Sequence, residues 1–274
     1  MNLGIGNFKR TQPFSVALWM NTPHHKERTV VYSRSKAWTD AGSRGYQMLL
    51  RNGHISASLI HFWPGNAINI RTTAKVPKNE WHHVAITYDG STKAGGLEIY
   101  VDGKLAKTEI HKDNLYKNIT GGGNDHIVIG QRFRDVGFAE GLVDDFRVFE
   151  RELTGGEVAQ LHDGQALAKL LVKPADALRQ AERDALRAYY LATANEAYTK
   201  QLTELSTARE KFTQLLDGKT EIMVMEETKL KPRSTFVLNR GVYNQPGERV
   251  GPETPAILPP FSNCLLYTSD AADE

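Results

Sequence analysis

Cysteine is almost absent from this sequence, and its charges are nearly balanced. The 274 residues include one cysteine, Cys264, so no disulfide can form within the chain. No apolar run approaches the ~20 residues that a membrane-spanning helix needs, so we expect no transmembrane segment. The 34 basic and 32 acidic residues give a formal net charge of +2, which argues against nucleic acid as a partner. Residues 1–14 also lack the basic-then-apolar layout of a signal peptide.

The end of the chain, residues 264–274, shows no pattern that links it to the Pro-rich stretch before it. It resembles one translated reading frame of a transposase-type sequencing adaptor, and we interpret it as an artefact. Leaving it out removes the only cysteine. It also removes Asp270, Asp273 and Glu274, which raises the formal net charge from +2 to +5. A positive charge of this size, spread along the chain, affects solubility more than the choice of partner.

Up to about residue 149 the apolar residues recur with a period of two, which is typical of β-strands. Phe14, Val16 and Leu18, for example, share one face of a strand. Asn52-Gly53 and Asp102-Gly103 separate strand-like runs, and both pairs favour tight hairpins because these residues tolerate positive φ. Strands are expected at residues 14–20, 29–34, 46–51, 55–60, 67–72, 81–88, 96–101, 104–110, 126–130 and 140–149. Many short strands with Gly-rich turns and no helices between them predict an antiparallel β-sandwich or barrel.

A helical pattern follows the last of these strands. Thr154 can cap a short helix that ends at Asp163-Gly164. Residues 175–216 are rich in Ala, Leu, Glu, Lys and Arg, with apolar residues at helical spacing. Because Asn195 interrupts this pattern, residues 164–218 are predicted to form an antiparallel helical hairpin whose apolar stripes pack together.

Three motifs in the first half of the chain belong together. They are FSVALWM at 14–20, EWHHVAITYDG at 80–90 with LEIYVDG at 97–103, and GLVDDFRVF at 141–149. In combination they resemble the laminin-G-like domain, in its three-part form with a concanavalin A-like fold. The resemblance covers residues 1–163 and implies an antiparallel jelly-roll β-sandwich. It also implies a first strand that pairs with the closing strand, and this first strand is missing or reduced here.

A second resemblance lies near the end of the chain. The segments MVMEE at 223–227, PRSTFVLNRG at 232–241 and YNQPGE at 243–248 resemble the entry to a C-terminal domain of unknown function in large planctomycete cytochrome-c-type proteins. This resemblance implies that residues 219–263 are the truncated start of that domain, with a short strand at 222–225. It also implies a periplasmic or cell-envelope location. Haem is expected only in a missing N-terminal region, since the C-x-x-C-H attachment pattern is absent from this sequence.

Concanavalin-type sandwiches include glycosidases, which need two carboxyl groups facing the same sugar. Asp144 and Asp145 are adjacent in an expected strand and therefore point to opposite faces. Glu98 has Gly96 and Tyr100 at the positions that share its face, so it has no acidic partner on its own strand. We therefore expect no catalytic residue in this chain. Any redox or hydrolytic activity of the longer protein is expected to lie outside it.

Asp144 is the candidate metal ligand of this sequence. Laminin-G-like domains often hold a structural Ca²⁺ ion near the rim of the sheet, and an acidic pair beside Gly141 fits such a site in type. The alternative is that one aspartate caps a loop while the other faces solvent. His82 and His83 are adjacent in a strand and cannot chelate one metal together, and His24-His25 lacks the spacing of a zinc site.

Trp38, Trp63 and Tyr46 are the candidate ligand contacts. Trp38 lies in a polar loop and Trp63 precedes a Pro-Gly turn, and loop aromatics at the rim of a sandwich stack on sugar rings or anchor proteins. The alternative is that these rings cover the ends of the core. Trp19 is expected on the outer side of its sheet, because it alternates with Leu18.

Two functions follow from these features. The first is a recognition module that binds polysaccharide or a surface protein. The second is a structural spacer that docks on flanking domains of the same chain, which the helical segment after the sandwich favours because rigid linkers hold neighbouring domains in place.

Overall fold

The computed structural model of this chain describes residues 4–35, 44–121, 126–132, 135–219, 234–241, 244–251 and 257. The chain divides into two compact units, Met1–Thr220 and Glu221–Glu274. Trp38, the expected strand at 222–225 and the adaptor-like end lie outside the described residues.

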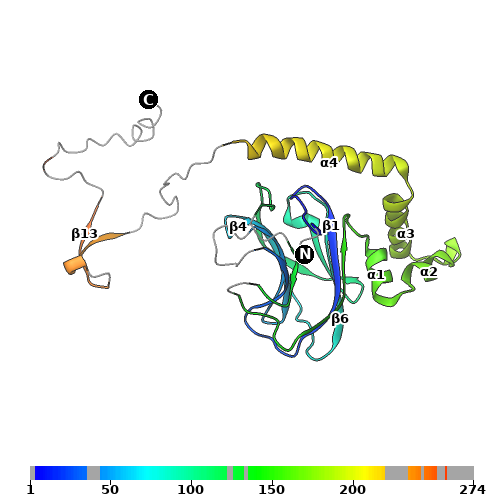
Figure 1. Ribbon diagram of the computed structural model, residues 1–274, viewed down its shortest axis with the longest axis horizontal. Coiled ribbons are helices and arrows are strands. Elements are labelled where there is room, and N and C mark those ends of the chain that lie inside the picture. The colour runs from blue at the N-terminus through cyan, green and yellow to red at the C-terminus, as the bar shows by residue number, and fades with distance from the viewer. Residues whose placement is uncertain are drawn as a thin grey trace. The chain divides into compact units, whose positions relative to one another are not determined.

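The first unit contains a sandwich of two antiparallel sheets (Figure 1). Sheet A has the order β11-β1-β6-β7-β8, and sheet B has the order β10-β2-β3-β4-β5-β9. The strands of sheet A are β1 (Phe14–Asn21), β6 (Trp81–Tyr88), β7 (Leu97–Val101), β8 (Lys104–Leu105) and β11 (Leu142–Phe149). The strands of sheet B are β2 (Thr29–Arg34), β3 (Gly45–Arg51), β4 (His54–Phe62), β5 (Asn66–Thr72), β9 (Thr108–Asn114) and β10 (Val128–Ile129). The predicted jelly-roll sandwich is confirmed, with β11 at an edge of sheet A.

The core lies between the two sheets and follows the alternation of the sequence. Phe14, Val16 and Leu18 point inward from β1 and are buried against residues of sheet B, each contributing about 1.5–3 kcal/mol. Both predicted hairpin turns are confirmed, since Asn52 and Asp102 adopt φ angles of 52° and 49°. The single strand expected at 104–110 is instead two strands, because the chain leaves sheet A after β8 and enters sheet B at β9.

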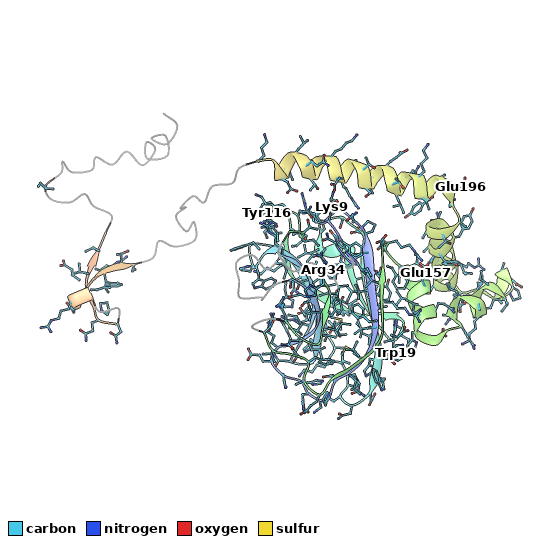
Figure 2. All side chains as sticks on the ribbon, in the orientation of Figure 1. Lys9, Trp19, Arg34, Tyr116, Glu157 and Glu196 are labelled. Atoms are coloured by element: carbon cyan, nitrogen blue, oxygen red, sulfur yellow. The ribbon has the colours of Figure 1, made fainter. Side chains whose placement is uncertain are left out.

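Helix α1 (Gly155–Asp163) covers part of the outer face of sheet A. The Thr154 hydroxyl accepts a hydrogen bond from the backbone N–H of Glu157, and the Glu157 carboxylate accepts one from the backbone N–H of Thr154, so two N–H groups at the start of the helix are satisfied. Val158 packs with Tyr100 and with small residues of β1 and β6 in a second apolar cluster. Trp19 lies on this outer face, as predicted, and its ring stacks on His162 with 5.5 Å between the ring centroids. Figure 2 shows Trp19 and Glu157 on this side of the sandwich.

Helices α2 (Ala166–Leu171), α3 (Gln180–Thr193) and α4 (Glu196–Asp217) follow. The predicted break at Asn195 is confirmed, because its side chain caps α4 by accepting a hydrogen bond from the Tyr198 backbone at 2.8 Å. The helices differ from the expected antiparallel pair: α3 and α4 meet at a steep angle in Figure 1, and the apolar stripe of α4 stays largely exposed.

Polar contacts account for this course of α4. Glu210 accepts hydrogen bonds from Lys9 at 2.6 Å and from Thr11 at 2.9 Å, and Arg209 donates to the backbone oxygen of Asp89 at 2.9 Å. These contacts hold α4 against the edge of the sandwich instead of along α3, and Lys9 lies beneath α4 in Figure 2.

The second unit contains two described strands, β12 (Thr235–Leu238) and β13 (Pro246–Val250), which pair in antiparallel fashion. All the residues of this pair are exposed, as expected of a short segment that cannot bury itself. Within the described residues, no helix is long and apolar enough to cross a membrane.

Candidate functional site

Trp63 lies where the sequence places it, in the turn between β4 and β5, and its ring is partly exposed. The structure adds two exposed aromatic side chains nearby, Phe62 at 46% and Tyr116 at 40% exposure. The backbone of Tyr116 is tied to this hairpin by a hydrogen bond of 3.0 Å to Asn66. Pairing of β5 with β9 brings these distant segments together, so no local pattern around Tyr116 predicts its position.

Tyr46 is a core residue, contrary to its expected role as a ligand contact. It is 2% exposed, and its ring packs against Phe14 with 4.8 Å between centroids and against Tyr32 with 6.4 Å. Burial raises the pKa of its hydroxyl. The β3 backbone turns this side chain into the sandwich, where no surface ligand reaches it.

Asp144 is exposed on edge strand β11, where its carboxylate accepts a hydrogen bond of 2.7 Å from the backbone of Asp145. Asp145 pairs with Arg147 at 2.7 Å on the surface. These contacts match the alternative in which one aspartate serves a local turn and the other faces solvent. In the part of the chain that the structure describes, no three His, Cys, Asp or Glu side chains are grouped to hold a metal ion. Calcium binding, which also uses backbone oxygens, stays a prediction.

A cavity of about 400 Å³ lies between the outer face of sheet A and helices α3 and α4. Strand β7 contributes Glu98 and Tyr100, which point outward because they alternate with the core-facing Ile99. The segment after β11 contributes Glu152. Helix α4 closes the cavity with Tyr198, Leu202, Leu205 and Arg209, and further lining groups are Asp89 and Arg151.

Negative charge dominates the polar side of this cavity. Tyr100 donates a hydrogen bond of 2.7 Å to Glu98, whereas Arg151 is occupied by Glu157 at 2.6 and 3.0 Å. Glu152 is an exposed residue of this lining, and its pKa is raised to about 7, chiefly because neighbouring side chains displace water from its carboxyl group and further by the carboxylates of Asp89 and Glu98, while Arg209 acts in the opposite direction. A carboxyl group that titrates near neutral pH in a cavity marks a candidate functional site.

The pairing of Glu98 with Glu152 in one cavity cannot be predicted from local sequence. Along β7 itself Glu98 has no acidic neighbour on its own face, but the return of the chain after β11 places Glu152 in the same cavity. The arrangement can accept hydrogen bonds from hydroxyl or amino groups and can pack an apolar surface against Tyr198, Leu202 and Leu205.

Residues 1–159 match the model of the concanavalin A-like lectin/glucanases superfamily, in its laminin-G form. The chain belongs to this superfamily. No curated protein matches the chain. The expected relation of residues 219–263 to cytochrome-c-type proteins stays a prediction.

Several solved structures resemble the sandwich of this superfamily member. The botulinum neurotoxin serotype G binding domain is 20% identical over 58% of this chain and 38% of its own, with a TM-score of 0.42. A putative carbohydrate-binding protein from Bacteroides ovatus is 16% identical over 55% of this chain and 40% of its own, with a TM-score of 0.41. The Ruminococcus gnavus IT-sialidase CBM40, bound to alpha2,3 sialyllactose, is 16% identical over 55% and 83%, with a TM-score of 0.45. The chain spans about two fifths of the length of the first two.

Proposed function

We propose that this chain is a recognition module that binds carbohydrate in the cavity between sheet A and helices α3 and α4. The observation that carries the proposal is the combination, in about 400 Å³, of the Tyr198 ring with the carboxyl groups of Glu98 and Glu152. Cavities of this size hold small ligands, and a few converging polar groups fix their orientation.

The chemistry of the lining favours a sugar over a purely apolar ligand. Carboxylates and tyrosine hydroxyls accept or donate hydrogen bonds to ring hydroxyl groups, while the C–H face of a pyranose packs on an aromatic ring. Leu202 and Leu205 extend the apolar wall. Because Arg151 is already paired with Glu157, its charge does not neutralise the cavity, and hydroxyl donors have free carboxylate oxygens to meet.

The experiment is binding of the full chain to a polysaccharide array, followed by calorimetry on each hit. Tyr198→Ala removes the exposed ring of the cavity, and Trp63→Ala is the matched aromatic control at the β4–β5 turn. We expect Tyr198→Ala to weaken binding at least about tenfold, since aromatic packing contributes ~1 kcal/mol or more beyond buried area, while Trp63→Ala leaves binding unchanged.

The other outcomes distinguish binding in the cavity from binding at the aromatic turn and from a spacer role. Loss of binding in Trp63→Ala alone would place the ligand on the aromatic turn and refute the cavity assignment. Silence of the folded protein on every polysaccharide would favour a spacer, for which the hydrogen bonds of Glu210 on α4 with Lys9 and Thr11 already tie the helical segment to the sandwich.

A second candidate function, glycoside hydrolysis, rests on one observation. Glu152, whose pKa is about 7, and Glu98 line the same cavity, and glycosidases use one protonated and one ionised carboxyl group. Release of reducing sugar from an array hit, abolished by Glu152→Gln and by Glu98→Gln, would establish this activity. Binding without turnover would leave recognition as the function.

The location and cofactors of the longer protein are proposals from the resemblance alone. We place the module in the periplasm or cell envelope, attached to a cytochrome-type protein whose haem lies outside this chain. A structural Ca²⁺ ion near Asp144 is likewise a proposal from the resemblance alone. Calorimetric titration with CaCl₂ tests it by comparing the parent chain with Asp144→Asn.

A further inference from the structure

One end of sheet B carries a group of aromatic side chains that the core does not use. Phe62 and Trp63 lie at the end of β4, and Tyr116 lies beside them, because β5 pairs with both β4 and β9. Phe62 and Tyr116 are exposed and the Trp63 ring is partly exposed; Tyr116 is labelled at this end of the sandwich in Figure 2. We refer to these three residues as the aromatic tip. Neighbouring exposed apolar side chains, unlike scattered single ones, mark an interaction surface.

The aromatic tip protrudes from the sandwich. Pro64 and Gly65, which form the turn after Trp63, are both exposed. A Cβ atom built at Gly65 would meet no atom within 4 Å beyond its chain neighbours, so open solvent surrounds the turn. Small ligands bind in concave sites that enclose them. The tip therefore suits a broad partner that accepts a protruding wedge.

Positive charge flanks the aromatic tip. Arg44 precedes β3, at the end that pairs with the last residues of β4, and Lys117 directly follows the tyrosine of the tip. Both cations act on His61, the residue before the tip: burial lowers the pKa of its imidazole, and repulsion from Arg44 and Lys117 lowers it further. The hydrogen bond to the Asn118 carbonyl and the carboxylate of Asp217 act in the opposite direction. Two cations thus stand beside three aromatic rings at the same end of the sheet.

We propose that the aromatic tip, with Arg44 and Lys117 beside it, docks on the surface of a membrane that contains anionic phospholipid. Tryptophan and tyrosine are enriched where a bilayer meets water, because one part of each ring is apolar and another is polar. Lysine and arginine near such a surface are attracted to the anionic headgroups. A fluid interface accepts a protruding turn without a matching hollow, which favours lipid over a protein partner.

This attachment is peripheral, because a single turn is far too short to cross the ~30 Å hydrocarbon core of a bilayer. It uses none of the residues that line the cavity between sheet A and helices α3 and α4. Membrane docking is therefore a second function of the chain, independent of the carbohydrate binding proposed above.

The test is sedimentation of the full chain with vesicles of phosphatidylcholine, either pure or with about one third phosphatidylglycerol. We expect binding to the mixed vesicles at least about tenfold tighter than to the pure ones, because each basic residue near an anionic surface strengthens binding about fivefold. Arg44→Gln/Lys117→Gln should remove this difference between the two lipids. The matched control, Lys104→Gln/Lys107→Gln, changes two exposed lysines that precede β9 at the opposite end from the tip and should keep the difference.

The apolar contribution is tested by Phe62→Ala/Trp63→Ala. Removing two rings should weaken binding to the mixed vesicles about tenfold or more, since burial of a large apolar side chain contributes about that factor by itself. Trp63→Phe keeps an apolar ring at the turn and should bind within a few-fold of the parent. This conservative variant separates loss of the tip from loss of the fold.

Trp81 supplies the matched aromatic control. Its side chain is 44% exposed, and it opens β6, whose far end at Tyr88 is hydrogen-bonded through Arg10 to Asn118 near the tip. Trp81 therefore lies at the other end of the sandwich, and Trp81→Ala should bind vesicles as the parent does. Brominated lipid, which quenches tryptophans that enter the bilayer, should quench the fluorescence of Trp81→Phe but not that of Trp63→Phe.

Three results would overturn the proposal: no vesicle binding by the folded parent, equal loss in Trp81→Ala, or quenching that survives Trp63→Phe. Binding to bacterial membrane fragments but not to protein-free vesicles made from their lipids would also overturn it, and would assign the tip to a protein partner. Tyr198→Ala, in the cavity, should leave vesicle binding unchanged, so failure of membrane docking is distinguishable from failure of carbohydrate binding.

Discussion

Replacing Asp135 by Asn is the most informative single change to the sandwich. The side chain of Asp135 is fully buried. Its carboxylate accepts five hydrogen bonds, two from Arg28, two from Arg132 and one from the backbone of Val136. Burial acts to raise its pKa, but the bonds from both arginines outweigh that effect and lower it. The ionised carboxylate is therefore what holds two guanidinium groups in a poorly solvated position.

Asparagine keeps the size of the side chain but removes the charge and turns one acceptor into a donor that faces a guanidinium group. Breaking a buried ion pair in this way costs about 3–5 kcal/mol of folding free energy. Five bonds at about 1.5–3 kcal/mol each would predict more. Asparagine keeps one side-chain oxygen that accepts hydrogen bonds, and 10% of the Arg28 side chain is exposed to water. We therefore expect a loss of about 3–5 kcal/mol and not the sum of the five bonds.

Urea unfolding at 25 °C measures this loss, with Asp145→Asn as the control. The Asp145–Arg147 pair has the same 2.7 Å distance as the Asp135–Arg28 pair. Its side chains are much more exposed, 43% for Asp145 and 51% for Arg147. An exposed pair contributes only about 0–1 kcal/mol. A loss in Asp135→Asn no larger than that in Asp145→Asn would refute the reasoning that burial, at equal distance, sets the strength of these pairs.

Three further predictions concern the core, the first helix and the cavity. Leu18→Ala removes a fully buried side chain and should lower the free energy of unfolding by about 3–5 kcal/mol in urea; a loss under about 1 kcal/mol would contradict the described core. Thr154→Ala removes the cap of α1 and should cost about 1 kcal/mol, with Thr203→Ala, on the exposed side of α4, as a near-neutral control. The pKa of Glu152 rises from 4.5 to about 7 on folding, so its protonated form is favoured in the folded chain, and the stability that it contributes falls as pH rises through that window. The difference in unfolding free energy between the parent and Glu152→Gln should therefore decrease from about pH 5 to about pH 8, and a flat difference would show that Glu152 titrates normally.

The sequence predicted those features that depend on neighbouring residues. Alternation in β1 identified the core face, Asn52-Gly53 and Asp102-Gly103 identified two hairpins, and Thr154 identified the start of α1, because φ preferences and capping act within a few residues. Asn195 was likewise found as a helix boundary from its own chemistry.

Where the local pattern was ambiguous, the prediction from sequence was wrong. In the run around Tyr46, both Met48 and Leu49 are apolar and both are buried, so the alternation of β3 did not reveal which face carries the tyrosine. The tertiary structure decides this through the register of β3 with β2 and β4, which places Tyr46 inside the sandwich.

Features that need distant segments were decided by the tertiary structure alone. Glu98 and Glu152 meet in one cavity because the chain returns past β7 after completing sheet A, and Phe62 and Tyr116 share the aromatic tip because β5 pairs with both β4 and β9. The angle between α3 and α4 likewise depends on Glu210 and its partners near the N-terminus. Local sequence fixes backbone preferences over a few residues, whereas charge clusters and cavities arise from strand order and packing, which no short stretch of this chain encodes by itself.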